Sequence, residues 1–228
     1  MVFDYLVVWT ELQVPSGLEL HAEQWAGYFQ PVIHAPGHIQ SDWARVRERS
    51  DIVMLASLWH TAGEFRDFTA SPCAQLYREN LASVGIIPVS SRETVNGSGY
   101  WFDCMQRSFV QLFWVYFPAP VTEDQRAQVQ KLRGLATPAP APGASRQYEL
   151  QRSPPKQLWV AQTESWHGQE VQLLLWPHFW KNEEAAEWRL LPANHYETIM
   201  ERFTEALEKV DPKEWKEEFY RFQKLPRL

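Results

Sequence analysis

The chain has 228 residues, of which 45% are hydrophobic and 14% aromatic, and this composition is typical of a packed globular protein. Its net charge of −6 and its lack of any basic block argue against nucleic acid as the main partner, because phosphate binding requires clustered Lys and Arg. No apolar run approaches the roughly 20 residues that span a bilayer, no signal peptide is indicated, and the two cysteines form no metal motif, so a cytoplasmic protein is predicted.

The first half of the sequence predicts the order strand, helix, strand, strand, helix, strand. The helix from residue 62 is interrupted at Ser71-Pro72, where Ser71 is expected to cap a second helix that ends at Gly85. This is the ferredoxin-like order. The predicted strands are 4–13, 39–49, 52–59 and 86–95, and the predicted helices are 18–29, 62–70 and 73–84, with Pro31 expected to break the first helix.

The second half predicts a modified repeat of the same plan. A helix capped by Thr122 follows the first strand, and residues 136–155, rich in Pro and Ala, are expected to form an inert surface connection rather than a lid. The last segment, 215–222, is expected to be helical or extended. The predicted strands are 109–117, 157–166 and 169–176, and the predicted helices are 122–135, 183–188 and 195–210.

An internal repeat supports this division. In each half an apolar strand ends in Trp (Trp59 and Trp176), a His follows closely (His60 and His178), and an acidic helix start comes next. Two fused copies are therefore expected, at residues 1–105 and 106–228. Two ferredoxin-like sheets that pack face to face would bury their open apolar faces and form a barrel.

The chain resembles the antibiotic-biosynthesis-monooxygenase group of the dimeric α/β barrel superfamily. The similar features are the strand that ends in Trp59, the acidic helix with Phe65 and Phe68, and Ser71-Pro72 followed by Tyr77. The similarity is good over residues 39–84 and weaker over the second half. In that group two chains usually build the barrel, and the duplication implies that this chain can build one alone.

The resemblance implies a range of activities. The superfamily includes cofactor-free oxygenases that act on aromatic polyketides, haem-degrading enzymes, decarboxylases, cyclases and proteins without known activity. The haem-degrading branch uses an Asn on the first strand, the Trp at the strand end, and a His about ten residues after that Trp. This chain has no Asn in its first strand, and Thr69 and Ala186 stand at the His positions, so haem degradation is not expected.

The remaining residue types predict chemistry in an apolar cavity. No phosphate loop, nucleophile elbow or zinc-spaced His/Cys cluster is present, so no cofactor or metal is indicated. A base with a pKa near neutrality favours His, and the catalytic candidates are His60, His178 and His38, with Arg45 as the cation that pairs with an enolate or carboxylate. Substrate contacts are assigned to an aromatic set with one loop histidine, namely Trp9, Trp43, Trp59, Trp114, Tyr116, Trp176 and His34.

Each of these assignments has a plainer alternative. The histidines could be exposed turn residues, the aromatics could be core residues, and Arg45 could be a solvated strand residue. The sequence therefore predicts an α+β fold of two ferredoxin-like repeats that forms an intramolecular dimeric α/β barrel. The expected function is a cofactor-independent oxygenase of secondary metabolism acting on an aromatic, polyketide-like molecule. A decarboxylase or cyclase and a non-catalytic binding protein are the alternatives, and the sequence leaves open whether two chains also form a homodimer.

Overall fold

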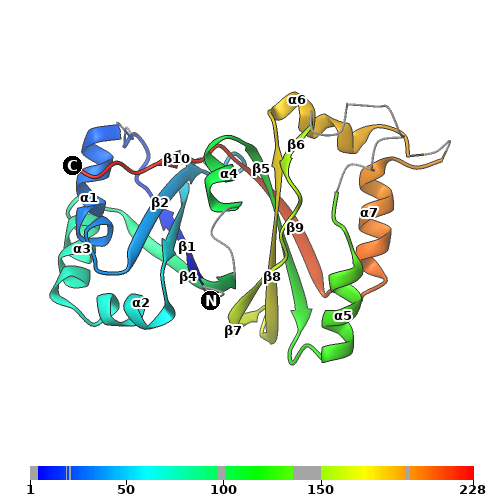
Figure 1. Ribbon diagram of the computed structural model, residues 1–228, viewed down its shortest axis with the longest axis horizontal. Coiled ribbons are helices and arrows are strands. Elements are labelled where there is room, and N and C mark those ends of the chain that lie inside the picture. Colours follow the sequence, from blue (N-terminus) through cyan, green and yellow to red (C-terminus); the bar gives the residue numbers. More distant parts are fainter. Residues whose placement is uncertain (1–4, 19, 21, 97–100, 136–149, 194–195) are drawn as a thin grey trace. The chain divides into compact units, whose positions relative to one another are not determined.

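A computed structural model describes residues 5–18, 20, 22–96, 101–135, 150–193 and 196–228. The chain divides into two compact units (Figure 1). The first unit comprises Met1–Gln106 and Arg221–Leu228, and the second comprises Arg107–Tyr220. The sequence analysis assigned the last residues of the chain to the second repeat, whereas here they belong to the first unit.

The first unit has an antiparallel sheet in the order β10-β2-β3-β1-β4. Strands β2, β3, β1 and β4 occupy the positions of a ferredoxin-like sheet, and the short strand β10 extends its edge. The strands are β1 (Tyr5–Gln13), β2 (His38–Arg45), β3 (Ile52–Trp59), β4 (Ile87–Asn96) and β10 (Gln223–Lys224).

Helices cover one face of this sheet (Figure 1). Their apolar residues, such as Trp25 and Phe29 of α1 and Phe68 of α2, form buried clusters with side chains from β1 and β3. The helices of this layer are α1 (Ala22–Ile33), α2 (Ala62–Thr69) and α3 (Pro72–Ser83), whereas the short helix α4 (Phe102–Gln106) has no residue in these clusters.

The second unit repeats the plan with the strand order β7-β8-β5-β9, and β6 pairs with β8. One buried cluster joins its sheet to α5 and α7, with Val129 and Phe203 as helical members. Its elements are β5 (Phe109–Pro118), α5 (Glu123–Lys131), β6 (Gln151–Ser153), β7 (Leu158–Trp166), β8 (Gln169–Trp180), α6 (Glu183–Ala186), the 3-10 helix η3 (Glu187–Leu190), α7 (Ile199–Glu208) and β9 (Glu214–Tyr220).

Three expectations about these elements were wrong. Helix α1 continues through Pro31 to Ile33, because Val32 and Ile33 are buried against the sheet. Strand β8 does not end at Trp176 but runs to Trp180. Part of the Pro- and Ala-rich stretch forms β6, and its residues 136–149 lie outside the described chain, as does residue 195 of the predicted helix 195–210.

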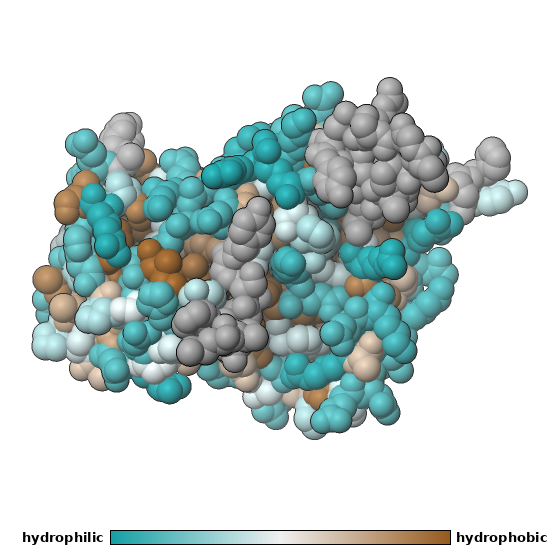
Figure 2. All heavy atoms as spheres, viewed as in Figure 1, coloured by the Kyte–Doolittle hydropathy of each residue, from teal (hydrophilic) through white to brown (hydrophobic). Residues whose placement is uncertain are grey.

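Charged and polar side chains dominate the visible face of the molecule (Figure 2). No helix in the described part of the chain is long and apolar enough to cross a membrane.

Candidate functional site

Strand alternation gives the sheet of the first unit two faces with different roles. On β3, Ser57 and Trp59 point toward the helices, and Ser57 lies opposite Val8 of β1. The neighbouring residue Trp9 points to the other face, where its ring stacks on Trp101 at a centroid distance of 6.2 Å. Of the predicted aromatic set, Trp59 therefore faces the helices and Trp9 does not.

A pocket of about 190 Å³ lies on this helix-facing side, and we call it the Trp59 pocket. Apolar side chains with a few convergent polar groups line it, which is the usual composition of a small-molecule site. The apolar lining residues are Val8, Val32, Leu55, Trp59, Phe65, Phe68, Ala74 and Pro88, and the polar ones are Thr10, Ser57, Thr69, Tyr77, Arg78 and Ser91.

The indole of Trp59 is held firmly in the wall of this pocket. It is fully buried. The ring centroids of Phe65 and Phe68 from α2 lie 5.2 and 5.3 Å from the centroid of its ring. Its Nε1–H donates to the hydroxyl of Ser57 at 3.0 Å. Helix α2 is fixed in turn by its N-cap Thr61, whose hydroxyl accepts from the backbone N–H of the third helical residue, Glu64.

Helix α3 brings Tyr77 to the pocket. Ser71 caps this helix and Pro72 occupies its first turn, as the sequence predicts. Tyr77 lies three residues after the buried Ala74, so both are on the same face of the helix. Burial raises the pKa of the Tyr77 phenol above its ordinary value, so the hydroxyl stays protonated at neutral pH and can donate a hydrogen bond.

Three further hydroxyls and one cation complete the polar side of the pocket, and the hydroxyl of Thr69 donates to a backbone carbonyl of α2 at 2.8 Å. The hydroxyls of Thr10 and Ser91, on the neighbouring strands β1 and β4, are 3.4 Å apart. Arg78, next to Tyr77 on α3, is exposed and lines the pocket at its solvent side. These groups can hold an oxygen-bearing ring edge while the apolar walls hold the ring itself.

His38 supports Trp59 but does not line the pocket. The two rings meet edge to face with centroids 5.3 Å apart, and a ring nitrogen of His38 lies 2.8 Å from the Ser41 hydroxyl. Burial, together with the charge of Arg227, lowers the pKa of His38 to about 4, so its imidazole is neutral at pH 7. This geometry gives His38 a positioning role.

The structure places three other predicted residues outside the Trp59 pocket. His34 is exposed, lines a separate surface hollow of about 250 Å³ and lies 3.1 Å from the side-chain oxygen of Gln30. His60 is exposed immediately after β3. Arg45 is exposed and donates to the backbone carbonyl of Ser50.

In the second unit apolar side chains fill the equivalent space. Trp176 lies on β8, opposite Phe113, and the ring of Phe203 of α7 packs edge to face on it with centroids 5.5 Å apart. Leu174 takes the place that Ser57 has in the first unit, two residues before the tryptophan. Trp176 is therefore a core residue, and the hydroxyl groups of the Trp59 pocket have no counterpart on this strand.

His178 lies inside β8 rather than at the strand end that the sequence suggested. It is fully buried, and burial lowers its pKa to about 3, so the ring is neutral. Nδ1 lies 3.0 Å from the backbone carbonyl of Trp176, and Nε2 accepts from the backbone N–H of Leu135 at 2.9 Å. Because both ring nitrogens are engaged, His178 fastens the chain around Leu135 to the sheet.

The other aromatic candidates pack within their own units and are not among the lining residues of the Trp59 pocket. Trp43 faces the helices but contacts Trp25, with ring centroids 5.2 Å apart, and does not line the pocket. Tyr116 stacks on Trp166 at 4.1 Å. Trp114 lies beneath the ammonium group of Lys216, at 4.8 Å. These contacts show that the three side chains pack against other residues of the protein.

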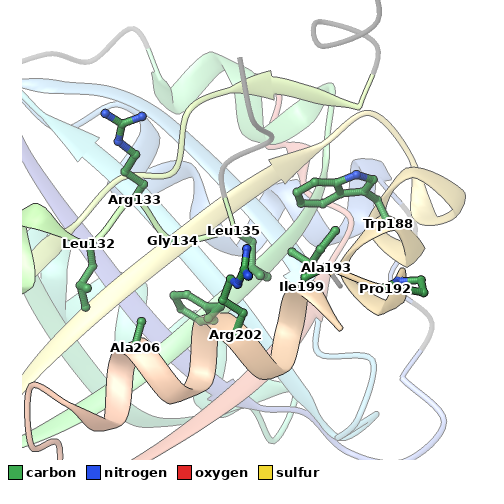
Figure 3. A pocket seen from close by; sticks show the side chains of 11 residues that line it. Leu132, Arg133, Gly134, Leu135, Trp188, Pro192, Ala193, Ile199, Arg202 and Ala206 are labelled. Atoms are coloured by element: carbon green, nitrogen blue, oxygen red, sulfur yellow. The ribbon is translucent and has the colours of Figure 1, made fainter. Parts of the chain in front are cut away.

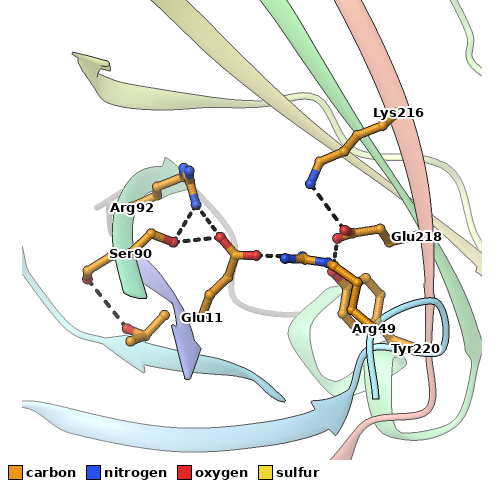
Figure 4. Close-up of polar contacts among 9 residues, drawn as sticks. Glu11, Arg49, Ser90, Arg92, Lys216, Glu218 and Tyr220 are labelled. Atoms are coloured by element: carbon orange, nitrogen blue, oxygen red, sulfur yellow. Dashed lines mark hydrogen bonds and ion pairs between the residues drawn. The ribbon is translucent and has the colours of Figure 1, made fainter. Parts of the chain in front are cut away.

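A buried carboxylate lies on the opposite face of the first sheet, next to Trp9 on β1. Glu11 accepts from Arg49 at 2.6 Å, from Arg92 at 3.0 Å and from Ser90 at 2.7 Å, and the two guanidinium groups reach it from different sides (Figure 4). Burial alone would raise the pKa of Glu11, but these hydrogen bonds and the charge of Arg92 lower it to about 2. Glu11 is thus a paired structural anion.

Asp42 is a second buried carboxylate on that face. It accepts from the side-chain amides of Gln40 and Gln106, and burial raises its pKa to about 6. A raised pKa is one mark of a functional acid. Asp42 does not line any of the pockets described here. The described residues also contain no group of three or more His, Cys, Asp or Glu side chains that could hold a metal ion.

The comparisons identify the fold. The chain matches a protein described as an "anthrone oxidase-like protein" with a TM-score of 0.56 and 14% identity, covering 99% of this chain and 95% of the other. It matches the "putative monooxygenase" of Lactobacillus acidophilus with a TM-score of 0.54 and 9% identity, over 98% and 97% of the two chains. It also matches the "Putative monooxygenase" of Fusobacterium nucleatum with a TM-score of 0.55 and 9% identity, covering 99% of this chain and 94% of the other. The chain therefore shares the α+β fold of these proteins.

At identities of 9 to 14% these comparisons show the α+β fold and do not show an activity. No family model matches the sequence. No curated protein matches it either.

Most of the polar groups of the Trp59 pocket are not among the site residues predicted from the sequence. Ser57 is the one hydroxyl in the otherwise apolar strand 52–59, two residues before Trp59 and therefore on the same face. Tyr77 shares a helical face with Ala74 and Leu81. Both signals are present in the sequence, whereas the approach of Thr10 to Ser91 depends on the pairing of distant strands.

Proposed function

We propose that the chain is an oxygenase that binds a small, flat phenolic molecule in the Trp59 pocket and oxidises it with molecular oxygen, without a metal or nucleotide. The observation that carries this proposal is the convergence of the Ser57, Thr10 and Tyr77 hydroxyls on an apolar pocket bounded by Trp59. The names of the proteins with the same fold, including an anthrone oxidase-like protein, support an oxygenase-like reaction.

The size of the pocket narrows the substrate class. Its volume of about 190 Å³ is below the roughly 300 to 1,000 Å³ that is typical of sites for drug-sized ligands. One or two fused rings therefore fit better than a three-ring polyketide. The same volume is too small for a flavin or a haem.

The reaction that suits these groups begins with an ionised substrate. A phenolate or enolate is electron-rich, and the protonated Tyr77 and the hydroxyl of Ser57 can donate hydrogen bonds to its oxygen. The described lining residues include no carboxylate or imidazole, so the acidity of the substrate itself, aided by the positive charge of Arg78, supplies the anion. The activated carbon transfers an electron to O₂, the two radicals combine to a hydroperoxide, and loss of water leaves a carbonyl. One oxygen atom enters the product and the other leaves as water, so no external reductant is required.

The test is oxygen consumption with 1,5-dihydroxynaphthalene and with anthrone, followed by mass spectrometry of the product formed under ¹⁸O₂. The proposal expects uptake of one O₂ for each quinone formed and one ¹⁸O atom in the product, and faster turnover of the two-ring substrate. Tyr77→Phe and Ser57→Ala should each lower kcat/KM by about tenfold or more, which corresponds to about 1.4 kcal/mol. His60→Gln, at an exposed site, serves as the matched control and should not change the rate.

Other outcomes would favour the alternative functions. Turnover of a phenolic acid that releases carbon dioxide or forms a ring without O₂ uptake would indicate a decarboxylase or cyclase in the same pocket. Saturable binding that Tyr77→Phe weakens, with no product under any condition, would indicate a binding protein. Equal oxygen uptake by the wild type and both pocket variants would refute the assignment of the Trp59 pocket.

A further inference from the structure

A larger pocket lies wholly within the second unit, and we call it the Arg202 pocket (Figure 3). It has a volume of about 430 Å³ and is bounded by α7, by residues 132–135 and by the segment 188–193. Helix α7 contributes Ile199, Arg202, Phe203 and Ala206, whose spacing places them on one face of the helix. None of its described lining residues belongs to a strand, whereas strands β1, β3 and β4 contribute to the Trp59 pocket.

Residues 132–135 form a fixed wall. The backbone N–H of Leu135 donates to His178, and its carbonyl accepts from Gln151 at 2.8 Å. Gly134 has a φ of +64°, and a Cβ at this position would lie 2.6 Å from Nε2 of His178. Only glycine lets the backbone lie this close to the sheet, and the two hydrogen bonds of the next residue, Leu135, hold the segment in this position.

The segment before α7 forms a second fixed wall. The backbone N–H of Ile199 donates to the carbonyl of Leu191 at 3.0 Å, and that of Ala193 donates to the carbonyl of Glu197 at 2.8 Å. Thr198 closes a capping box at the helix start. The pocket is therefore held open by hydrogen bonds that do not involve a ligand, which lowers the entropic cost of binding one.

Two arginines line the pocket, Arg133 and Arg202, and Figure 3 shows the side chain of Arg133 pointing away from Arg202. The Nε–H of Arg202 donates to the carboxylate of Glu197 at 3.0 Å, and no other side-chain hydrogen bond of Arg202 is formed within the described chain. Figure 3 shows the guanidinium reaching across the pocket toward Leu135. The described lining residues include no carboxylate, and the rest of the wall is mainly apolar, with the rings of Phe203 and Trp188 among the side chains.

We propose that the Arg202 pocket binds an aromatic carboxylate. The planar guanidinium presents paired N–H groups that match the two oxygens of a carboxylate, and a charge-assisted pair of this kind is stronger than a neutral hydrogen bond. The ring system of the ligand lies against Phe203 and Trp188. The volume is within the range for small-molecule sites, and the site is independent of the oxygenase proposed for the first unit.

The test is calorimetric titration with 1-naphthoate and with its neutral isostere 1-naphthamide. We expect saturable binding of naphthoate. The dissociation constant of naphthamide should be about tenfold higher, or more. Arg202→Gln should weaken naphthoate by about tenfold or more and should leave naphthamide unchanged, and Arg202→Lys should give an intermediate loss. Lys209→Gln removes the same charge from the same helix at an exposed ion pair with Glu205 and is the matched control.

A second variant fixes the location. Ala206→Phe fills the pocket from the half-buried face of α7 and should abolish naphthoate binding, while Tyr77→Phe in the first unit should not affect it. Circular dichroism and the thermal midpoint confirm that each variant is folded. Absence of saturable binding to the wild type would overturn the proposal. So would naphthoate binding that survives Arg202→Gln and Ala206→Phe, or binding that Tyr77→Phe removes.

Discussion

Mild acid should weaken the second unit through His178. Burial lowers the pKa of this ring from 6.5 to about 3 in the folded chain, because a charged imidazole would lose its hydration. An unfolded chain has no such burial, so its histidine takes up a proton near pH 6.5. Between these values the unfolded state binds one more proton than the folded state, and stability therefore rises with pH. The contribution is fully present above pH 6.5 and is lost as the pH falls to about 3.

The size of this effect follows from the two pKa values. Each pH unit between 6.5 and about 3 removes about 1.36 kcal/mol, so the loss approaches 4 to 5 kcal/mol over the whole interval. That is a large share of the roughly 5 to 15 kcal/mol that stabilises a typical domain. His178→Gln removes the titrating ring. The change should cost about 1 to 3 kcal/mol at pH 7.5, because glutamine replaces the hydrogen bond to Leu135 imperfectly.

Urea unfolding followed by circular dichroism and tryptophan fluorescence, at pH values from 7.5 to 4, measures both effects. The wild type should lose stability faster with acid than His178→Gln, so the two stability curves should converge as the pH falls. His60→Gln, at an exposed position, is the control and should follow the wild type. His38 also has a lowered pKa but is present in all three proteins, so it does not affect the difference. Parallel curves for the wild type and His178→Gln would refute the reasoning.

Two further substitutions test other contacts. Glu11→Gln removes a carboxylate whose pKa is lowered from 4.5 to about 2 in the folded chain. As the pH falls from 4.5 to about 2, the free energy of unfolding of the wild type should therefore decrease by about 3 kcal/mol more than that of the variant. Urea titrations measure this difference, with the exposed Glu205→Gln as the control. Gly134→Ala should be more destabilising than Gly168→Ala in thermal unfolding. Both glycines have positive φ, with an expected cost of about 1 to 2 kcal/mol for alanine, but only at Gly134 would the new methyl group meet His178. Equal losses at the two glycines would show that this contact is not restrictive.

Local signals in the sequence predict much of the first unit. The strand 52–59, the helix start at Ala62 and the cap at Ser71 all agree with the structure, because each depends on residues within one turn or strand. Pro31 was expected to break the first helix, but tertiary contacts decide its effect, and β8 continues past its expected end at Trp176 although Pro177 follows. Pro177 lacks an N–H, but its carbonyl accepts from Lys156 on the side where β6 and β7 leave a gap, so β8 continues without losing a ladder bond to β5.

The candidate site was less predictable than the fold. Trp59 and its strand were identified from the apolar pattern, but a repeat in sequence does not imply a repeat in function. The equivalent Trp176 is covered by Phe203, and whether a tryptophan faces a pocket or a core depends on side chains from distant elements. His178 shows the same limit, because only the long-range contact with Leu135 identifies it as a structural anchor.

The placement of β10 has a consequence for how the protein is made. Its residues pair with β2, and Leu225 packs into the core cluster of the first unit, so this unit is interrupted in sequence by the whole of the second. During synthesis the first unit emerges first and can collapse early, but its outer strand arrives only after every residue of the second unit has been translated. The edge of β2 therefore stays open for the intervening time. Ribosomal pausing or premature termination within the second unit would leave the first unit with an unpaired strand, exposed to chaperones and to self-association.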